Sequence, residues 1–199
     1  NMRTNATFKK VKDLIESGEI GQVRRVHWEV TNWFRTNYYY ATGGWRGTWK
    51  GEGGGVLMNQ CPHNLDLFQW MFGMPQRVRG FCQFGRFHEI EVEDDVTAVM
   101  QYDNGTTATF VTSTGEAPGR NVLEISAEQG RLTVKDGTHI HFQRNRTPMS
   151  KFCMEAEAAF AMPESWHMDI PVDNSGGQHV EILQNFTNAI LKDEKLLSP

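Results

Sequence analysis

Alternating apolar and polar residues run through the second half of the chain and predict a meander of β-strands. In residues 96–102 every second side chain is apolar, which is the pattern of a strand with one buried face. The pair Asn104-Gly105 follows this strand and predicts a tight type I′ hairpin, since both residues tolerate a positive φ. Strands are expected over residues 77–87, 96–102, 106–114, 121–127, 131–135 and 138–143.

Helical periodicity predicts a helix near each end of the chain and another in its middle. Residues 4–17 carry an apolar stripe, with Thr4 or Asn5 as the cap and Gly18 just past the end. Residues 176–193 carry a second stripe. Between the first helix and the meander we expect a strand within residues 21–34 and an irregular, aromatic-rich loop from 35 to 51, whereas residues 152–172 fit neither pattern clearly.

The amphipathic run from Gly55 to Gly73 contains Pro62, and this leaves two interpretations. One helix can start at Pro62, because the first turn tolerates proline. Alternatively, a longer helix begins near Gly55 and is kinked at Pro62 by the loss of one hydrogen bond. We favour the second, longer helix.

Together these elements predict one α+β domain over residues 1–199, a largely antiparallel open sheet with helices packed on one face. The opposite face of such a sheet needs a cover, so we expect a homodimer or higher oligomer through it. Hydrophobic residues make up 39% of the chain and charged residues 22%, as in ordinary globular proteins.

Charge and composition narrow the classes of partner. A net charge of −4 builds no basic surface for nucleic acid. No apolar run approaches the roughly 18 residues that a membrane span needs. The three cysteines form no CxxC pair, which favours a reducing cytoplasm over a disulfide framework.

Polar side chains interrupt the amphipathic run at Asn59, Gln60 and His63. A spacing of four residues puts Asn59 and His63 on one side of a helix. If the helix starts at Pro62, His63 lies in the first turn, where the helix dipole favours the neutral imidazole that a general base needs. The simpler alternative is that His63 is a hydrogen-bonded residue near a helix end. Cys61 and His63 are a weak candidate for a nucleophilic thiol with its base, because side chains two residues apart on a helix point in different directions.

Other candidate features allow ordinary explanations. The glycines 53–55 lack the remaining residues of GxGxxG and of a phosphate loop, and they indicate a close backbone approach instead. His139 and His141 share a strand face without further ligands at suitable spacing, so we expect no metal. The acidic run 93–95 is read as a charged entrance to a strand.

The aromatic loop is the remaining candidate site. Its tryptophans and tyrosines alternate with Arg35 and Arg46, and such residues either wall a pocket for a sugar or pack over the edge of the sheet. Both alternatives stay open at this point.

The segment WRGTWKGEGGGVLMNQCPHNLDLFQWMFGMP (45–75) resembles the signature of the Gfo/Idh/MocA oxidoreductases, in their C-terminal domain. The segments 1–23, 93–119 and 178–190 are similar to the entry helix and strand, the later strands and the closing helix of that domain. The resemblance implies a two-domain parent enzyme that holds NAD or NADP in an N-terminal Rossmann domain and binds a sugar or polyol here. No strand–GxGxxG–helix unit occurs in the 199 residues, so we expect an excised domain without the Rossmann half and without bound cofactor.

The resemblance also implies roles for residues. The catalytic histidine of the family falls on His63, and its aspartate falls on Asn59, where an amide cannot accept a proton. Arg35, Trp45 and Arg46 match positions of a sugar-oriented branch and, with Gln60, are candidates for substrate binding. Two alternatives remain: a non-catalytic carbohydrate-binding or dimerisation module, and a glycosidase that uses tightly held NAD.

Overall fold

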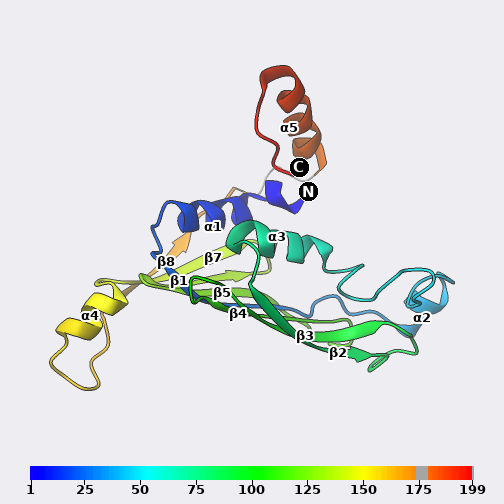
Figure 1. Cartoon of the computed structure of the whole chain (residues 1–199), viewed down its shortest axis with the longest axis horizontal. Coiled ribbons are helices and arrows are strands. Elements are labelled where there is room, and N and C mark those ends of the chain that lie inside the picture. The colour runs from blue at the N-terminus through cyan, green and yellow to red at the C-terminus, as the bar shows by residue number, and fades with distance from the viewer. Residues whose placement is uncertain (174–178, 199) are drawn as a thin grey trace.

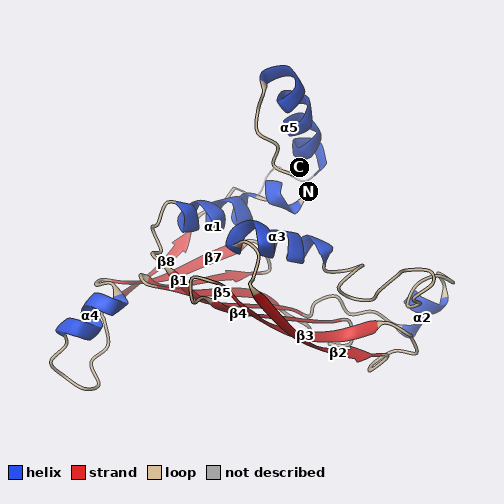
Figure 2. Ribbon diagram, viewed as in Figure 1, coloured by secondary structure: helices blue, strands red, loops and turns tan. Residues whose placement is uncertain are grey.

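The computed structural model describes residues 1–173 and 179–198, and within them eight strands form one open sheet. Their order across the sheet is β2-β3-β4-β1-β5-β6-β7-β8. Every neighbouring pair is antiparallel except β1 with β4, which is parallel. Figure 2 shows α1 and α3 on the same side of this sheet. The expected α+β fold with a largely antiparallel sheet is confirmed.

The elements follow the predicted order along the chain (Figure 1). The strands are β1 (Val23–Val30), β2 (Arg77–Phe84), β3 (Glu93–Gln101), β4 (Thr107–Ser113), β5 (Asn121–Ala127), β6 (Gly130–Lys135), β7 (His139–Asn145) and β8 (Ser165–Ile170). The helices are the short 3-10 helix η1 (Met2–Thr4), α1 (Ala6–Glu16), α2 (Asn37–Ala41), α3 (Pro62–Phe72), α4 (Met149–Glu155) and α5 (His179–Lys192).

The core lies between the sheet and the helices α1 and α3. Trp28 on β1 is fully buried and stands at its centre, with ring centroids 5.7 Å from Phe8 on α1 and 6.1 Å from Phe68 on α3. Its indole N–H donates to Asn121 Oδ1 at 3.0 Å, which satisfies the polar end of an otherwise apolar side chain. Both helices are therefore fixed to the sheet through one aromatic cluster.

The first helix begins and ends where the sequence indicates. Asn5 Oδ1 accepts from the backbone N–H groups of Thr7 and Phe8, so Asn5 is the cap that the sequence offered beside Thr4. Gly18 follows the helix with φ +75°, a left-handed conformation that glycine adopts without strain.

Turn geometry differs from the prediction at one hairpin. The prediction of a type I′ turn at Asn104-Gly105 is wrong, because only Gly105 of this pair has a positive φ. Its N–H donates to Tyr102 O at 3.1 Å, and the connection is a longer loop with glycine in the left-handed position. The hairpin between β6 and β7 has two positive φ values instead, 53° at Asp136 and 65° at Gly137, as a type I′ turn requires.

Two segments contain secondary structure that the sequence pattern did not predict. The aromatic loop includes the short helix α2, whose Tyr39 N–H donates to Thr36 Oγ1. The ambiguous stretch 152–172 divides into the end of α4 and the edge strand β8. The start of the expected closing helix, residues 176–178, lies outside the described residues, and α5 occupies the remainder up to Lys192.

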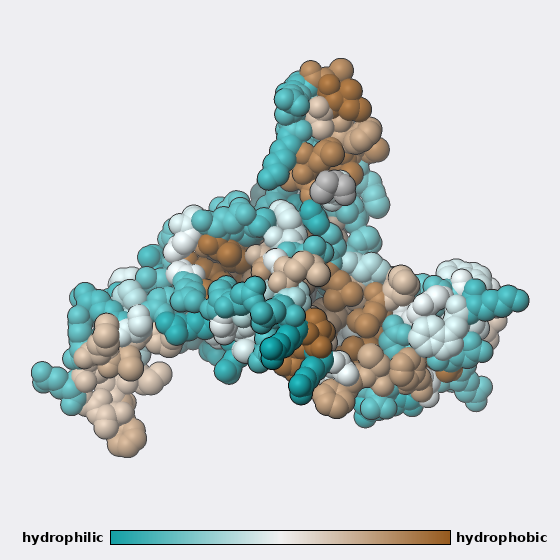
Figure 3. Space-filling view, in the orientation of Figure 1, coloured by the Kyte–Doolittle hydropathy of each residue, from teal (hydrophilic) through white to brown (hydrophobic). Residues whose placement is uncertain are grey.

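Two surfaces of the described chain stay uncovered. The sheet face opposite α1 and α3 carries a transverse row in which His27, Glu124, Thr133 and His141 are register neighbours. Helix α5 projects away from the sheet (Figure 1), and its apolar residues lie on the surface (Figure 3). The side chain of Phe186 on this helix is 55% exposed. None of the described helices is long and apolar enough to cross a membrane.

Candidate functional site

Helix α3 begins at Pro62, so the longer kinked helix that we favoured is wrong. Cys61, the N-cap residue, has φ −103° and ψ 7°, outside the helical range. The preceding residues form a separate hydrogen-bonded turn, in which Asn59 N–H donates to Gly55 O at 2.9 Å. His63 consequently lies in the first turn of α3, and its side chain is exposed.

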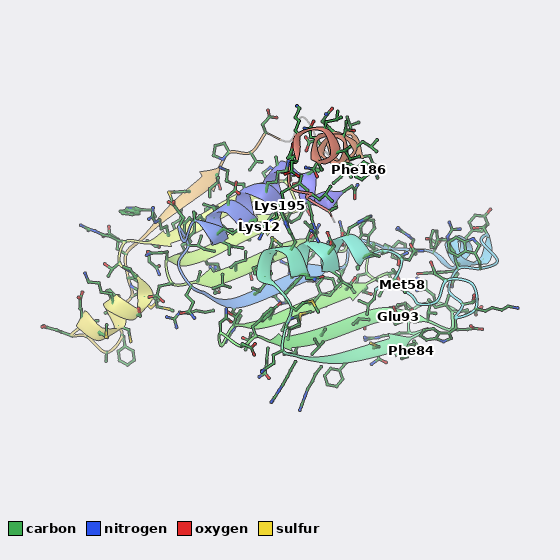
Figure 4. All side chains as sticks on the ribbon, turned by 45° about the horizontal axis from the view of Figure 1, so that its top comes forward. Lys12, Met58, Phe84, Glu93, Phe186 and Lys195 are labelled. Carbon is green, nitrogen blue, oxygen red and sulfur yellow. The ribbon has the colours of Figure 1, made fainter. Side chains whose placement is uncertain are left out.

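Glu93 fastens this turn to the start of β3. Its two carboxylate oxygens accept from Gly55 N–H at 2.9 Å and from Leu57 N–H at 3.2 Å, while its backbone carbonyl accepts from Val56 N–H at 2.9 Å. A Cβ on Gly55 would lie 1.9 Å from Glu93 O, which confirms the expected close backbone approach at this glycine. The expectation is wrong for Gly53, where a Cβ would meet nothing within 4 Å and the positive φ of 80° favours glycine instead. Figure 4 shows Glu93 close to Met58 at the end of the sheet.

Residues 93–95 form the charged start of a strand, β3, as predicted, but the first two do not face solvent. Glu93 is 6% exposed and Asp94 is fully buried. The Asp94 carboxylate accepts from the backbone N–H groups of residues 86–88 and lies 3.0 Å from His88 Nδ1. The other ring nitrogen of His88 lies 3.0 Å from Arg35 O. Each nitrogen of this buried imidazole therefore faces an oxygen acceptor, and the pair ties the aromatic loop to the β2–β3 connection.

The carboxylate of Glu52 holds Asn59, and Asn59 in turn bonds to Gln60. The amide nitrogen Nδ2 of Asn59 donates to Glu52 Oε1, and Asn59 Oδ1 accepts from Gln60 Nε2 at 3.1 Å. The second oxygen of Glu52 accepts from Gly47 N–H at 2.8 Å. Asn59 is exposed and Gln60 is buried, so this short chain of bonds runs from the interior to the surface.

The structure brings Arg35 and Arg46 together around the ring of Tyr39, and Trp45 joins them through its contact with Arg46. The guanidinium carbons of Arg35 and Arg46 lie 5.0 and 4.6 Å from the ring centroid of Tyr39. Arg46 also lies 4.7 Å from a Trp45 ring centroid, within the range of a cation–π contact. The Nε atoms of both arginines are buried without a hydrogen-bond partner in the described chain.

Both alternatives for the aromatic loop find support in different residues. Trp49 packs over the edge strand β2, with its ring centroid 6.0 Å from that of Phe84, which is the packing over the sheet edge that one alternative predicted. Tyr40 and Arg46 line a hollow of about 660 Å³ together with His88 and Glu91. His63 does not line this hollow, and Glu52 links the backbone beside Arg46 to Asn59.

The thiol and metal alternatives receive no support. Cys61 is buried, and burial raises the pKa of its thiol to about 11. That thiol contacts Thr112 Oγ1 at 2.9 Å. Among the described residues no group of three or more His, Cys, Asp or Glu is placed to hold a metal ion. His141 pairs with Asp169 and His167, at 2.8 and 3.2 Å.

The residues present do not fit a dinucleotide cofactor on their own. The described sheet contains a single parallel pair, β1 with β4, and the sequence holds no strand–GxGxxG–helix unit to receive a pyrophosphate. The chemistry available to this chain is proton exchange at an exposed imidazole and hydrogen bonding from the amides and arginines around it.

Several solved structures share this fold. The WlbA dehydrogenase from Chromobactrium violaceum, in complex with NADH and UDP-GlcNAcA, is 25% identical, with a TM-score of 0.73, and the match covers 95% of this chain and 50% of that one. The WlbA dehydrogenase from Bordetella pertussis, also with NADH and UDP-GlcNAcA, is 28% identical, with a TM-score of 0.66 and coverages of 74% and 43%. A levoglucosan dehydrogenase with NADH and levoglucosan, 15% identical, shares the fold at a TM-score of 0.74, with coverages of 100% and 56%.

The chain spans about half the length of these structures. Comparison with curated protein sequences finds no match. The model of the GFO/IDH/MocA C-terminal domain matches residues 8–133, which include the turn with Asn59, the first turn of α3 and strands β1 to β5. The chain therefore belongs to the GFO/IDH/MocA family of oxidoreductases, as a C-terminal domain.

Proposed function

We propose that this chain is the substrate-binding and catalytic-histidine domain of an NAD(P)-dependent oxidoreductase that acts on a sugar, a polyol or a related hydroxy compound. The observation that carries the proposal is the placement of His63. Its imidazole is exposed in the first turn of α3, beside the turn that presents Asn59. Among the described residues, none forms a hydrogen bond with this ring.

The role of His63 is to exchange a proton with a substrate hydroxyl. An imidazole suits this role because it can take and return a proton near neutral pH. The ring has to approach the hydroxyl oxygen to about 2.6–3.2 Å. Hydride transfer is the chemistry that a bound nicotinamide supplies, and this domain contributes the placement of the substrate and the handling of the proton.

The substrate contacts that we propose are Asn59, Gln60 and the cluster of Arg35, Trp45 and Arg46. Flat aromatic faces and forked guanidinium groups are typical of sites for sugars that carry oxygen-rich or anionic groups. The two WlbA structures hold a nucleotide-linked sugar acid, and the levoglucosan dehydrogenase holds a sugar derivative, which supports a sugar-type substrate here. NAD or NADP would be bound by the other half of the parent enzyme.

The proposed partner is a nucleotide-binding half that this chain lacks. Its support is the length of the solved structures, about twice that of the chain, and the uncovered apolar stripe on α5. Exposed stripes of this kind mark contacts with further protein surface. The cysteines of the described chain are all free thiols, in keeping with the proposed cytoplasmic location.

One observation favours a second function, that of a dimerisation module. The open sheet face is broad, and no described helix covers it, so a second copy can pack there face to face. This function is compatible with the first. A module that only dimerises or binds carbohydrate would form a stable dimer or bind sugar with no dependence on a nicotinamide partner.

The test compares the full-length parent and its His63→Asn variant in a substrate panel of polyols, free sugars and UDP-GlcNAcA, with NAD and NADP. General acid–base help is worth roughly 10²–10⁴ in rate, so we expect kcat to fall by that order. Near-wild-type turnover by the variant would overturn the role of His63. Glycoside cleavage without net cofactor reduction would indicate the glycosidase alternative, and reduction of NAD by the isolated 199-residue chain would contradict the proposal of a half-enzyme.

A further inference from the structure

The amide of Asn59 is clamped between two partners. Glu52 Oε1 accepts from its Nδ2, and its Oδ1 accepts from Gln60 Nε2 at 3.1 Å. An ionised carboxylate accepts hydrogen bonds and donates none. The amide nitrogen of Asn59, and not its oxygen, therefore faces Glu52. Glu52 is only partly exposed and its other oxygen accepts from Gly47 N–H, so both carboxylate oxygens are engaged.

We propose that Glu52 is the positioning residue of this site and supplies, one hydrogen bond away, the carboxylate that position 59 lacks; this inference rests on the proposed function. Glu52 fixes the amide of Asn59 with its nitrogen toward the carboxylate. The second hydrogen of that Nδ2 remains available, so Asn59 offers a donor to a substrate oxygen. The negative charge stays in the site, on the neighbouring side chain.

The same carboxylate joins the two halves of the site. Through Gly47 N–H it holds the backbone next to Arg46, whose guanidinium lies against Tyr39. A Cβ on Gly51 would lie 2.4 Å from Trp45 O, so the chain also turns tightly just before Glu52. Movement of Glu52 would therefore shift the arginine cluster and Asn59 together.

Residues 52 and 59 accordingly form a pair in which one member is a carboxylate and the other an amide. Asn59→Asp alone would bring two carboxylates into contact, and like charges at that distance disfavour each other. Glu52→Gln alone removes the charge and weakens a charge-assisted hydrogen bond. The exchanged pair, Glu52→Gln with Asn59→Asp, restores one carboxylate and one amide.

The first test is a double-mutant cycle on the 199-residue chain, read by urea unfolding at pH 7. We expect both single variants to unfold more readily and the exchanged double variant to recover, with a coupling of roughly twofold to a hundredfold in the unfolding equilibrium constant. Glu91→Gln is the matched control, because Glu91 is an exposed loop carboxylate that accepts one backbone N–H, from Trp49 at 3.1 Å. Strictly additive effects would overturn the pairing.

The second test measures kcat, KM and the pH profile of kcat/KM for the same variants in the full-length parent. We expect Glu52→Gln to lower kcat/KM by up to about a hundredfold, as for a misplaced contact, and the exchanged pair to regain most of it. An unchanged kcat/KM and pH profile in Glu52→Gln would overturn the positioning role. The His63→Asn variant distinguishes this failure from failure of the proposed function, because it does not alter the contact between residues 52 and 59.

Discussion

Replacing Glu93 by glutamine keeps the shape of the side chain and removes its charge. The Glu93 carboxylate is 6% exposed and accepts from Gly55 N–H and Leu57 N–H at 2.9 and 3.2 Å. In the variant one of these N–H groups faces an amide NH₂, which is itself a donor. A hydrogen bond to a charged group contributes about 1.5–3 kcal/mol, and a buried donor left without a partner costs about 1–3 kcal/mol. These figures describe one disrupted contact, so we expect a loss of about 2–3 kcal/mol in the free energy of unfolding.

Urea unfolding followed by far-UV circular dichroism measures this change, with Glu91→Gln as the control. A domain of this size loses roughly 2–4 °C in Tm per kcal/mol, so Glu93→Gln should melt about 4–12 °C lower. The exposed control should stay within about 0.5 kcal/mol of the wild type. Amide hydrogen exchange should accelerate at Gly55 and Leu57 before it does in the core strands. A loss below 0.5 kcal/mol in Glu93→Gln would refute the conclusion that this carboxylate fastens the turn.

Three further outcomes are expected. A thiol reagent at pH 8 should label the two exposed cysteines of the native chain and reach Cys61 only in urea. The reason is that Cys61 is buried and its pKa is raised to about 11. Labelling of all three thiols in the native chain would contradict the buried position of Cys61. Hydrogen bonds from Ser150, ahead of the contact with Arg24, lower the pKa of Glu128 to about 2 from its ordinary 4.5. The stability that the ionised Glu128 contributes is thus present above pH 4.5 and lost toward pH 2. Glu128→Gln should therefore be less stable than the wild type at neutral pH and lose less stability between pH 4.5 and pH 2. Acid titration of both proteins measures this difference, and equal curves of stability against pH would contradict it. If the open sheet face forms the dimer, Val111→Arg on that face should shift the mass measured by light scattering from dimer to monomer, and an unchanged dimer would exclude this face.

Much of the fold follows from local patterns. Period-two alternation placed most strands, because one face of the sheet is buried against α1 and α3 and the other is not. Asn5 and Gly18 marked the ends of the first helix through capping chemistry that acts within a few residues. The edge strand β8 escaped prediction because its side chains, such as Trp166, are largely exposed and carry no clear alternation.

The start of α3 depended on contacts far away in the sequence. Periodicity alone favoured a helix from Gly55, but Glu93, 38 residues later, takes the N–H of Gly55 and holds the turn apart from the helix. Pro62 then provides a helix start that needs no N–H donor. A spacing rule within a single segment does not contain that information.

The candidate site residues were predicted from their residue types, whereas the carboxylates that hold the surrounding loops in place were not. His63, Asn59 and the arginines stand out as polar groups in unusual company. Glu52 and Asp94 look like ordinary surface carboxylates, since nothing in their spacing signals that one binds Asn59 and the other is fully buried against His88. The only local signal was the acidic run at the start of a buried strand, where a charge needs a partner.

The most direct measurement is the distance from the His63 ring to the reacting hydroxyl in a structure of the full-length parent with its nicotinamide cofactor and substrate bound. We expect a ring nitrogen within about 2.6–3.2 Å of the hydroxyl oxygen, or joined to it through one water. A substrate bound against the arginine cluster, with another group in contact with the hydroxyl and His63 turned to solvent, would contradict it.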